Sequence, residues 1–253
     1  TISQTWNAID EHEEMKANKV DHSGLQNVLQ RRLSQLPVRQ SRLQILADGS
    51  RDTKFVVDDD YDGPKLPAPP AVPTEDHLQK MIAAFRQSKL LHYRYAHELI
   101  GRVTAIHRDQ ALNIQRIQFP PEARLTIVGD LHGQLQDLLA ILEFQGLPSP
   151  TNWYLFNGDF VDRGSHSIEV LWIIYVFKVM YPDYIWLNRG NHEHRLLNKR
   201  YKFERQVKMA YDERLYERVA LSFDVLPLCT IINKDVFVVH GGLTEYSDLT
   251  LSD

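Results

Sequence analysis

The sequence has one cysteine, no long apolar run and no excess of positive charge, and each of these absences excludes a class of protein. Cys229 has no second cysteine to pair with, which is typical of reducing compartments, so we predict a cytoplasmic location, with the nucleus as the alternative. No apolar run approaches the roughly 20 residues that cross a bilayer, so no membrane span is expected. The first residues are polar and acidic, unlike a secretory signal. The formal net charge of −4 gives no reason to expect nucleic acid as a partner.

Residues 1–60 differ in pattern from the rest of the chain and are predicted to form a helical extension. Apolar residues recur at helical spacing from Leu25 up to Pro37, where the pattern ends. Arg31 and Arg32 on this helix would face a partner such as calmodulin, whereas a helix packed on its own domain is the simpler interpretation. If the chain binds a regulatory protein, we expect the contact to be made through residues 1–60.

An acidic, proline-rich stretch follows, VDDDYDGPKLPAPPAVP. Its alternating aspartates imitate the first half of an EF-hand calcium loop. The twelfth position of such a loop is a bidentate glutamate, however, and here it is Pro69. We therefore interpret residues 61–73 as a linker rather than as a calcium site.

From Thr74 onward, strand and helix patterns alternate. Thr74 is a suitable N-cap for a helix, and acidic residues follow it directly. Later apolar segments predict strands at residues 125–128, 153–156, 184–187 and 236–239, with helices between them at residues 135–144, 168–180 and 203–223. This alternation indicates an α/β domain with largely parallel strands over residues 74–253. Such sheets bind ligands beyond the carboxyl ends of their strands.

Each of the four predicted strands is followed by Asp, Asn or His beside glycine, in the segments GDLHG, NGDFVDRG, NRGNHE and HGG. In the first of these, Asp130 and His132 supply a carboxylate and an imidazole, which suit metals such as Zn, Fe and Mn. The glycines permit a tight turn. Taken alone, this segment is explained equally well by a loop with two exposed polar residues. Four such strand ends in succession predict a shared metal centre.

These four segments resemble the signature blocks of the phosphoprotein phosphatase family of serine/threonine phosphatases, and the resemblance extends over residues 61–253. Within the family, YDGPKL, AFRQSKLLHYRY and LNRGNHE are most similar to the EF-hand-containing, retinal-degeneration-C-type branch, followed by the tetratricopeptide-linked phosphatase. Residues 1–60 themselves contain no recognisable EF-hand or calmodulin-binding IQ motif. The resemblance implies an α/β, calcineurin-like metallophosphoesterase fold, in which helices flank a central β-sandwich.

The resemblance also implies which residues hold metal ions. Asp130 and His132 would bind the first metal, and Asp159 would bridge it to the second. Asn191 and His240 would complete the second site. The two ions are expected to be Mn, or Fe together with Zn. A pair of metals about 3.5–4 Å apart neutralises a phosphate dianion, and water that bridges them becomes hydroxide near neutral pH.

Further side chains would act on the substrate, according to the same resemblance. Arg163, together with Asn191, would bind the substrate phosphate, because a guanidinium offers a planar fork that matches phosphate oxygens. His192, oriented by Asp162, would protonate the leaving serine or threonine oxygen. The expected reaction is direct attack of the metal-bound hydroxide on phosphoserine or phosphothreonine of a phosphoprotein, without a nucleophilic side chain. Cys229 is accordingly interpreted as a buried, inert thiol.

The family pattern continues beyond Asp253, where this sequence stops. The family's later part supplies another histidine for the second metal, a second phosphate-binding arginine and the last strands of the sandwich. We therefore expect either a fragment of a longer enzyme or a short protein that acts as a catalytically inactive scaffold. A different dinuclear phosphoesterase, such as a diadenosine tetraphosphatase, is a further alternative. It shares GDxHG and GNHE, but the longer GDFVDRG block favours protein substrates.

Overall fold

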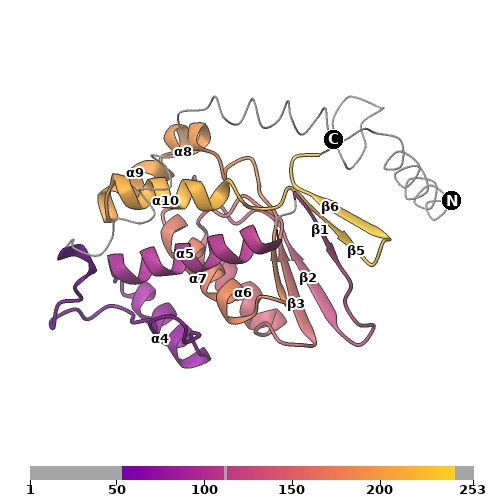
Figure 1. Cartoon of the computed structure of the whole chain (residues 1–253), viewed down its shortest axis with the longest axis horizontal. Helices are drawn as coiled ribbons and strands as arrows, with labels where there is room; N and C mark the ends of the chain where they lie inside the picture. Colours follow the sequence, from indigo (N-terminus) through magenta and orange to yellow (C-terminus); the bar gives the residue numbers. More distant parts are fainter. Residues whose placement is uncertain (1–52, 111–112, 243–253) are drawn as a thin grey trace, which may run out of the picture. The chain divides into compact units, whose positions relative to one another are not determined.

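The computed structural model describes residues 53–110 and 113–242, so most of the predicted N-terminal extension lies outside it. Within this range, six strands form two sheets of three strands each (Figure 1). The first sheet consists of the parallel strands β2 (Arg124–Val128), β3 (Asn152–Phe156) and β4 (Ile185–Leu187), in that order. The second has the order β1 (Ile114–Ile117), β5 (Cys229–Ile232) and β6 (Val236–Val239).

Three of the four strand pairs are parallel, as predicted for an α/β domain. The exception is β6, which is antiparallel to β5 because a tight hairpin joins them. Three residues connect the strands, and the first two, Asn233 and Lys234, have φ angles of 50° and 64°. The N–H of the third, Asp235, donates to the Ile232 carbonyl oxygen at 3.0 Å and closes the turn. The four predicted strands correspond to β2, β3, β4 and β6, whereas β1 is not predicted by the sequence pattern.

Strand β3 lies at the centre of the first sheet and is buried on both faces. Because side chains alternate along a strand, Tyr154 and Phe156 join the large core formed with the helices, whereas Leu155 joins a smaller core. This smaller core also contains Ile117 and Ile232 from the second sheet. The two sheets therefore pack face to face, as the predicted β-sandwich requires.

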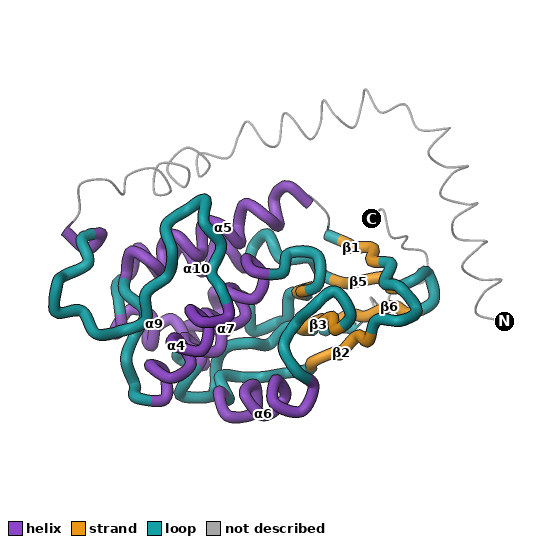
Figure 2. The backbone as a smooth tube through the Cα atoms, turned by 90° about the horizontal axis from the view of Figure 1, so that it is seen from below, coloured by secondary structure: helices purple, strands orange, loops and turns teal. Residues whose placement is uncertain are grey.

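The helices gather on the face of the first sheet that points away from the second sheet (Figures 1 and 2). They are α4 (Glu75–Arg86), α5 (Tyr93–Gln110), α6 (Leu135–Gln145), α7 (Ser167–Met180), α8 (Arg195–Tyr201), α9 (Phe203–Ala210) and α10 (Glu213–Phe223). Helix α4 begins directly after Thr74, as predicted. Helix α7 is apolar on all sides and almost wholly buried, which is typical of a central helix. None of the helices in the described range is both long and apolar enough to cross a membrane.

The single helix predicted over residues 203–223 is in fact two helices, α9 and α10, because Asp212 interrupts it. The Asp212 carboxylate accepts a hydrogen bond from the Leu215 N–H at 2.8 Å and so caps α10. Just before it, the Tyr211 hydroxyl donates to the Leu91 carbonyl oxygen at 2.7 Å. These two hydrogen bonds therefore divide the segment into two helices, although its apolar pattern would suit one long helix.

Residues 53–73, which the sequence assigns to the extension and the linker, lie against the helices. The Phe55 ring packs edge-on against Tyr93, with 5.4 Å between the ring centres. The Tyr61 hydroxyl donates to the Leu90 carbonyl oxygen at 2.9 Å, and burial raises the pKa of Tyr61 to about 12. This segment belongs to the same compact unit as the sheets.

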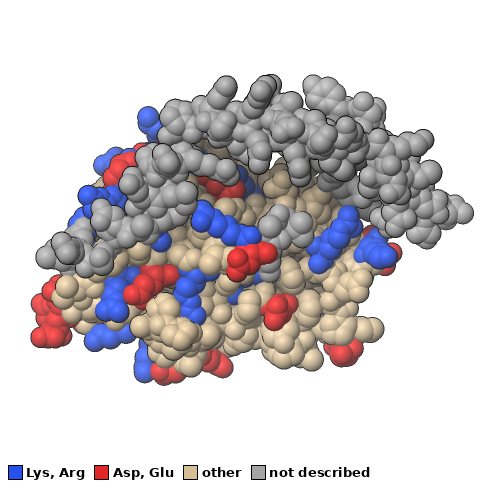
Figure 3. Space-filling view, in the orientation of Figure 1, with Lys and Arg blue, Asp and Glu red and all other residues tan. Residues whose placement is uncertain are grey.

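Charged side chains of both signs are interspersed over the face of the molecule in Figure 3. This mixture accords with the small formal net charge of −4. Electrostatic recognition on this face therefore depends on local groups of charge rather than on a single field of one sign.

Candidate metal centre

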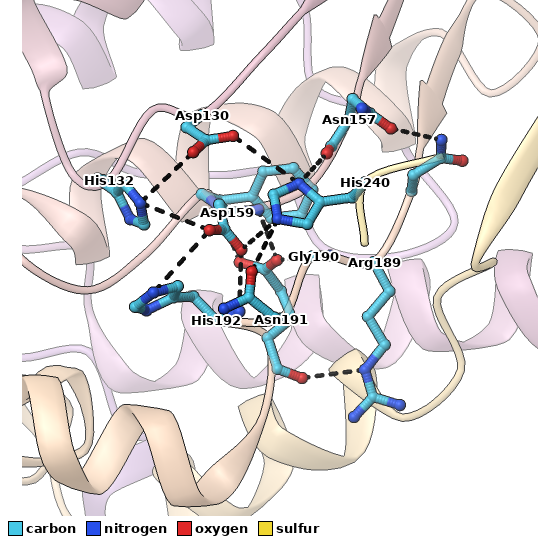
Figure 4. Close-up of polar contacts among 12 residues, drawn as sticks. Asp130, His132, Asn157, Asp159, Arg189, Gly190, Asn191, His192 and His240 are labelled. Atoms are coloured by element: carbon cyan, nitrogen blue, oxygen red, sulfur yellow. Dashed lines mark hydrogen bonds and ion pairs between the residues drawn. The ribbon is translucent and has the colours of Figure 1, made fainter. Parts of the chain in front are cut away.

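The turns that follow β2, β3, β4 and β6 meet at one place (Figure 4). The side chains predicted for the site come from these turns, with Asp130 and His132 after β2, Asp159, Asp162 and Arg163 after β3, Asn191 and His192 after β4, and His240 after β6. A continuous series of contacts, described below, connects all eight. The carboxyl ends of the strands thus bring the predicted residues together, as expected for an α/β sheet.

Several of these residues adopt a positive φ, which residues other than glycine rarely do. The angles are 42° at His132, 54° at Asp159, 69° at Asp162 and 64° at Arg163. Such conformations persist only where the surroundings hold them. Here the backbone N–H groups of Leu131 and His132 both donate to the Asp159 carbonyl oxygen, at 3.0 and 2.9 Å. The turns after β2 and β3 therefore hold each other in place.

The Asp159 carboxylate lies at the centre of the site, and the residue is only 3% exposed. Its Oδ1 accepts the His192 backbone N–H at 2.9 Å and lies 3.2 Å from His240 Nε2. Its Oδ2 lies 3.5 Å from His132 Nε2. Gly190 packs directly against this carboxylate, and a Cβ there would collide with it. One carboxylate therefore presents a different oxygen to each of two imidazoles.

Backbone carbonyl groups orient these two imidazoles. His132 Nδ1 lies 2.9 Å from the Val161 carbonyl oxygen, and His240 Nδ1 lies 2.7 Å from the Asn157 carbonyl oxygen. A carbonyl oxygen only accepts hydrogen bonds, so each Nδ1 carries a proton. The lone pair of each Nε2 then faces Asp159, which is the arrangement of metal-binding histidines.

Around His240, three electron-pair donors converge. Asn191 Oδ1 lies 2.9 Å from His240 Nε2, and Asp159 Oδ1 lies 3.2 Å from the same nitrogen (Figure 4). With the His240 proton on Nδ1, these atoms have no proton between them. A cation among them would remove the mutual repulsion of their lone pairs.

Two groups of potential ligands share the Asp159 carboxylate, and within each group all donor atoms lie within 4.8 Å of one another. One group also contains His132 and His192, and the other contains Asp130 and His240. Oxygen and imidazole nitrogen donors in this combination suit divalent metals of the first transition row. The donor set therefore fits two cations that share one carboxylate.

His192 is held differently from the other two imidazoles. Its Nδ1 lies 2.9 Å from Asp162 Oδ2, a carboxylate rather than a carbonyl, and both residues are buried. Asp162 also accepts the Phe203 N–H at 3.1 Å and the Asn198 amide at 3.2 Å. Burial raises the pKa of Asp162, and these hydrogen bonds offset part of that effect. The pair fixes a proton on Nδ1 and leaves Nε2 facing the site.

Arg163 lies next to His192, and its Nη2 is 3.4 Å from His192 Nε2. Its guanidinium carbon lies 5.4 Å from the centre of the Tyr201 ring. The side chain is exposed, and no carboxylate of residues 53–110 and 113–242 pairs with it. An exposed guanidinium that is not paired with a carboxylate is suited to bind the oxygens of a phosphate group.

Glu193 is a residue of the site that the sequence patterns did not single out. It is fully buried and accepts the backbone N–H groups of Asp159 at 2.7 Å, Phe160 at 2.9 Å and Gly190 at 2.9 Å. Burial, followed by the nearby Asp159 carboxylate, raises the pKa of Glu193 to about 8. The side chain joins the turn after β3 to the turn after β4. Its position at the end of NRGNHE, directly after His192, was the available signal.

A buried amide network also joins the two sheets beneath the site. Asn188 donates to Asn157 Oδ1 at 2.8 Å, and its own oxygen accepts from Gln115 at 3.1 Å and Thr230 at 2.7 Å. Because the Asn157 carbonyl oxygen accepts from His240, the network helps to position that imidazole. The two asparagines are the first residues of the segments NGDFVDRG and NRGNHE, whereas no sequence signal indicated Gln115 and Thr230, since their contacts exist only where the two sheets meet.

Two family models match the chain. The model described as calcineurin-like phosphoesterase matches residues 123–253, and the model described as PPP5 TPR repeat region matches residues 40–112. The first match includes every residue predicted for the site. The chain therefore belongs to the calcineurin-like phosphoesterase family.

Within that family, the chain is similar to serine/threonine phosphatases of the phosphoprotein phosphatase type. Serine/threonine-protein phosphatase 5 of Solanum lycopersicum is 43% identical over 81% of this chain and 36% of its own length. Serine/threonine-protein phosphatase with EF-hands 2 of Homo sapiens is 43% identical over 78% of this chain and 26% of its own length. These values confirm the predicted family, and the chain spans between about a quarter and just over a third of the length of these relatives.

A solved structure confirms the predicted fold. It is a protein serine/threonine phosphatase from Saccharomyces cerevisiae with similarity to human phosphatase PP5. The two structures superpose with a TM-score of 0.69 at 39% identity, over 71% of this chain and 58% of the yeast chain.

Proposed function

We propose that this chain is the metal-dependent catalytic part of a protein phosphatase that hydrolyses phosphoserine and phosphothreonine. The observation that carries the proposal is the Asp159 carboxylate. It lies between His132 on one side and Asn191 and His240 on the other, and the buried His192–Asp162 pair lies directly beside it. The names of the relatives support the same reaction class.

Two metal ions would be held by the side chains that surround Asp159. Asp130 and His132 would complete one site, and Asn191 and His240 the other. We propose Mn, or Fe together with Zn, as the ions. When bound, the ions would neutralise the substrate phosphate and lower the pKa of a water molecule to near neutrality.

The remaining side chains would act directly on the substrate. Arg163 would bind phosphate oxygens through its planar guanidinium, beside the amide of Asn191. His192 would give the proton on Nε2 to the oxygen of the leaving serine or threonine, since that nitrogen faces the site. Asp162 would keep Nδ1 protonated and hold the ring. We assign His192 to proton transfer rather than to a metal, because its Nε2 lies 3.4 Å from the Arg163 guanidinium, whose positive charge would repel a metal ion. The same nitrogen is also farther from Asp159 (3.9 Å) than the Nε2 atoms of the other two imidazoles (3.5 and 3.2 Å).

The reaction class can be tested by offering the Mn²⁺-loaded chain a phosphoserine peptide and diadenosine tetraphosphate in parallel. We expect the phosphopeptide to have the higher kcat/KM, and chelator treatment to abolish its hydrolysis. A preference for the dinucleotide would favour a different dinuclear phosphoesterase. Binding of metal and phosphopeptide without turnover would favour a scaffold.

Partners and location are also part of the proposal. We propose phosphoproteins as substrates and residues 1–60 as the contact for a regulatory protein. The match of residues 40–112 to the PPP5 TPR repeat region supports a role of that segment in protein interaction. The cytoplasmic location stays a prediction from the single cysteine.

A further inference from the structure

The short helix α8 carries exposed cations directly beside the phosphate site. From residue 194 to residue 203 the sequence reads HRLLNKRYKF, with four Lys or Arg residues and no acidic residue. Arg195 forms an ion pair with Asp224 at 2.9 Å. The other three, Lys199, Arg200 and Lys202, are exposed, and no carboxylate in the described part of the chain pairs with them. Three positive charges therefore remain available to a ligand.

Arg200 and Arg163 lie against the same aromatic ring. The guanidinium carbon of Arg200 is 5.6 Å from the centre of the Tyr201 ring, and that of Arg163 is 5.4 Å from it. Both distances are within the range of cation–π interactions. The Tyr201 ring in turn lies 4.9 Å from the His192 ring, measured between centres. One tyrosine thus places a second guanidinium close to the one that we assign to the phosphate.

The corner between α8 and α9 is attached to the catalytic side chains. Asn198 of α8 donates to the His192 carbonyl oxygen at 2.7 Å and to Asp162 at 3.2 Å. Lys202 turns the chain with a φ of 81°, and the next N–H, that of Phe203, donates to Asp162 at 3.1 Å. The backbone that carries Arg200 is therefore held in a defined position relative to His192.

The helix dipole offers a simpler reason for basic residues at this place. Cations in the last turn of a helix interact favourably with its negative end, and Lys199 and Arg200 occupy the last turn of α8. The dipole does not explain why the Arg200 guanidinium lies over Tyr201, on the ring that also contacts Arg163. That placement is what indicates a ligand.

We propose that Arg200 binds a second anionic group of the substrate, next to the phosphoserine or phosphothreonine that is hydrolysed. This inference rests on the proposed function and specifies its substrate class, namely phosphopeptides with a nearby carboxylate or second phosphate. Since both guanidiniums lie against one ring, the second anion would lie within roughly 10 Å, or about three residues of extended peptide. A guanidinium binds either anion through two parallel hydrogen bonds.

The test compares three phosphoserine peptides that differ only two residues after the phosphoserine, where they carry Ala, Asp or a second phosphoserine. Each is assayed with the unaltered chain, Arg200→Ala and Arg86→Ala. Arg86 is the matched control, because it is an exposed arginine in the last turn of another helix, α4. We expect the unaltered chain to prefer the two anionic peptides roughly fivefold in kcat/KM, and added salt to weaken the preference. Arg200→Ala should bring this ratio close to one, and Arg86→Ala should not change it.

Two results would overturn the inference. Arg200→Ala could lower kcat/KM equally for all three peptides, which would show a structural role. Alternatively, Arg86→Ala could abolish the preference for anionic peptides as completely as Arg200→Ala does, which would show that the preference depends on the overall charge of the chain. Binding of the same peptides, measured by fluorescence anisotropy, separates this inference from the proposed function. If no peptide is hydrolysed, the proposed function fails, yet Arg200-dependent binding of the anionic peptides would still support the second site, and equal binding would reject it.

Discussion

The turns of the metal centre and the helix α8 beside them hold their polar groups in opposite ways. In the turns, Asp159, Asp162 and Glu193 are buried, and each has several hydrogen-bond partners. On α8, Arg200 is exposed and contacts Tyr201, without a carboxylate partner among the described residues. A buried and fully satisfied network has one geometry and is costly to disturb, whereas an exposed charge contributes little to stability.

This difference separates two kinds of substitution. Changes in the turns should affect every substrate, because they alter the metal ligands or the groups that position them. Changes on α8 should affect some substrates more than others, because they alter only side chains next to the site of the substrate phosphate. Substitutions of Asp159, His192 and Glu193, all in the turns, test whether the turns hold the groups on which every substrate depends.

The largest effect is expected for Asp159→Asn. The carboxylate faces both His132 and His240, so the loss of its charge should remove metal from both sites and abolish activity. Asp130→Asn is the matched control, since the Asp130 side chain is more exposed and lies at the edge of the site. We expect it to weaken mainly one metal. Metal content per chain, measured by mass spectrometry, distinguishes the two, and full occupancy in Asp159→Asn would exclude a bridging role.

A smaller effect is expected for His192→Asn. The substitution should retain the metals and lower kcat on a phosphoserine peptide by roughly 10²–10⁴, the range of general acid–base catalysis. The loss should be smaller for an aryl phosphate, because a phenolate leaves with little help from a proton. Equal losses on both substrates would mean that His192 is not the acid. Loss of one metal would instead identify it as a ligand, which its 3.9 Å distance from Asp159 Oδ2 also allows.

Glu193→Gln tests the residue that links the turns. The amide has one oxygen instead of two, so at least one of the three backbone N–H groups loses its acceptor. We expect metal affinity to fall roughly 10- to 100-fold, as when other groups that orient metal ligands are lost. Titration of metal against a chelating dye measures this. Glu143→Gln, which changes an exposed glutamate on α6, should have no effect. If both variants bind metal normally, Glu193 does not position the site.

The sequence predicts the strand ends well because the signals for them lie within a few neighbouring residues. Each apolar run is followed within three residues by a glycine and a polar residue, and the strand ends of such a sheet lie close together. The features that the sequence does not predict depend on contacts between segments that are distant in the sequence. Strand β1 has the sequence IQRI, in which two of four residues are polar, and Gln115 is buried only because it donates to Leu187 and Thr230. The sequence does not predict Glu193 for the same reason. Its three partners are backbone N–H groups, and they come to lie around one side chain only when the turns are folded.

The smallest effect concerns a buried imidazole that lacks a carboxylate partner, in contrast to His192. His107 on α5 is 3% exposed, and neither ring nitrogen has a hydrogen-bond partner. Burial, followed by the nearby Lys178 charge, lowers the pKa of His107 from 6.5 to about 3. The folded state therefore binds fewer protons than the unfolded state between these values, so stability should fall as pH falls from 6.5 towards 3.

His107→Leu removes this proton linkage. At pH 5 the imidazole reduces the free energy of unfolding by about 2 kcal/mol relative to pH 8, and the leucine variant should lack that loss. Urea unfolding of the metal-free chain at pH 8 and pH 5 measures it, because removing metal separates this effect from protonation of the metal ligands. The value at pH 8, where the imidazole is neutral in both states, reports the packing difference alone. If both proteins lose the same stability between pH 8 and pH 5, then His107 finds a partner for its proton in the folded chain, and the contrast between the two buried histidines disappears.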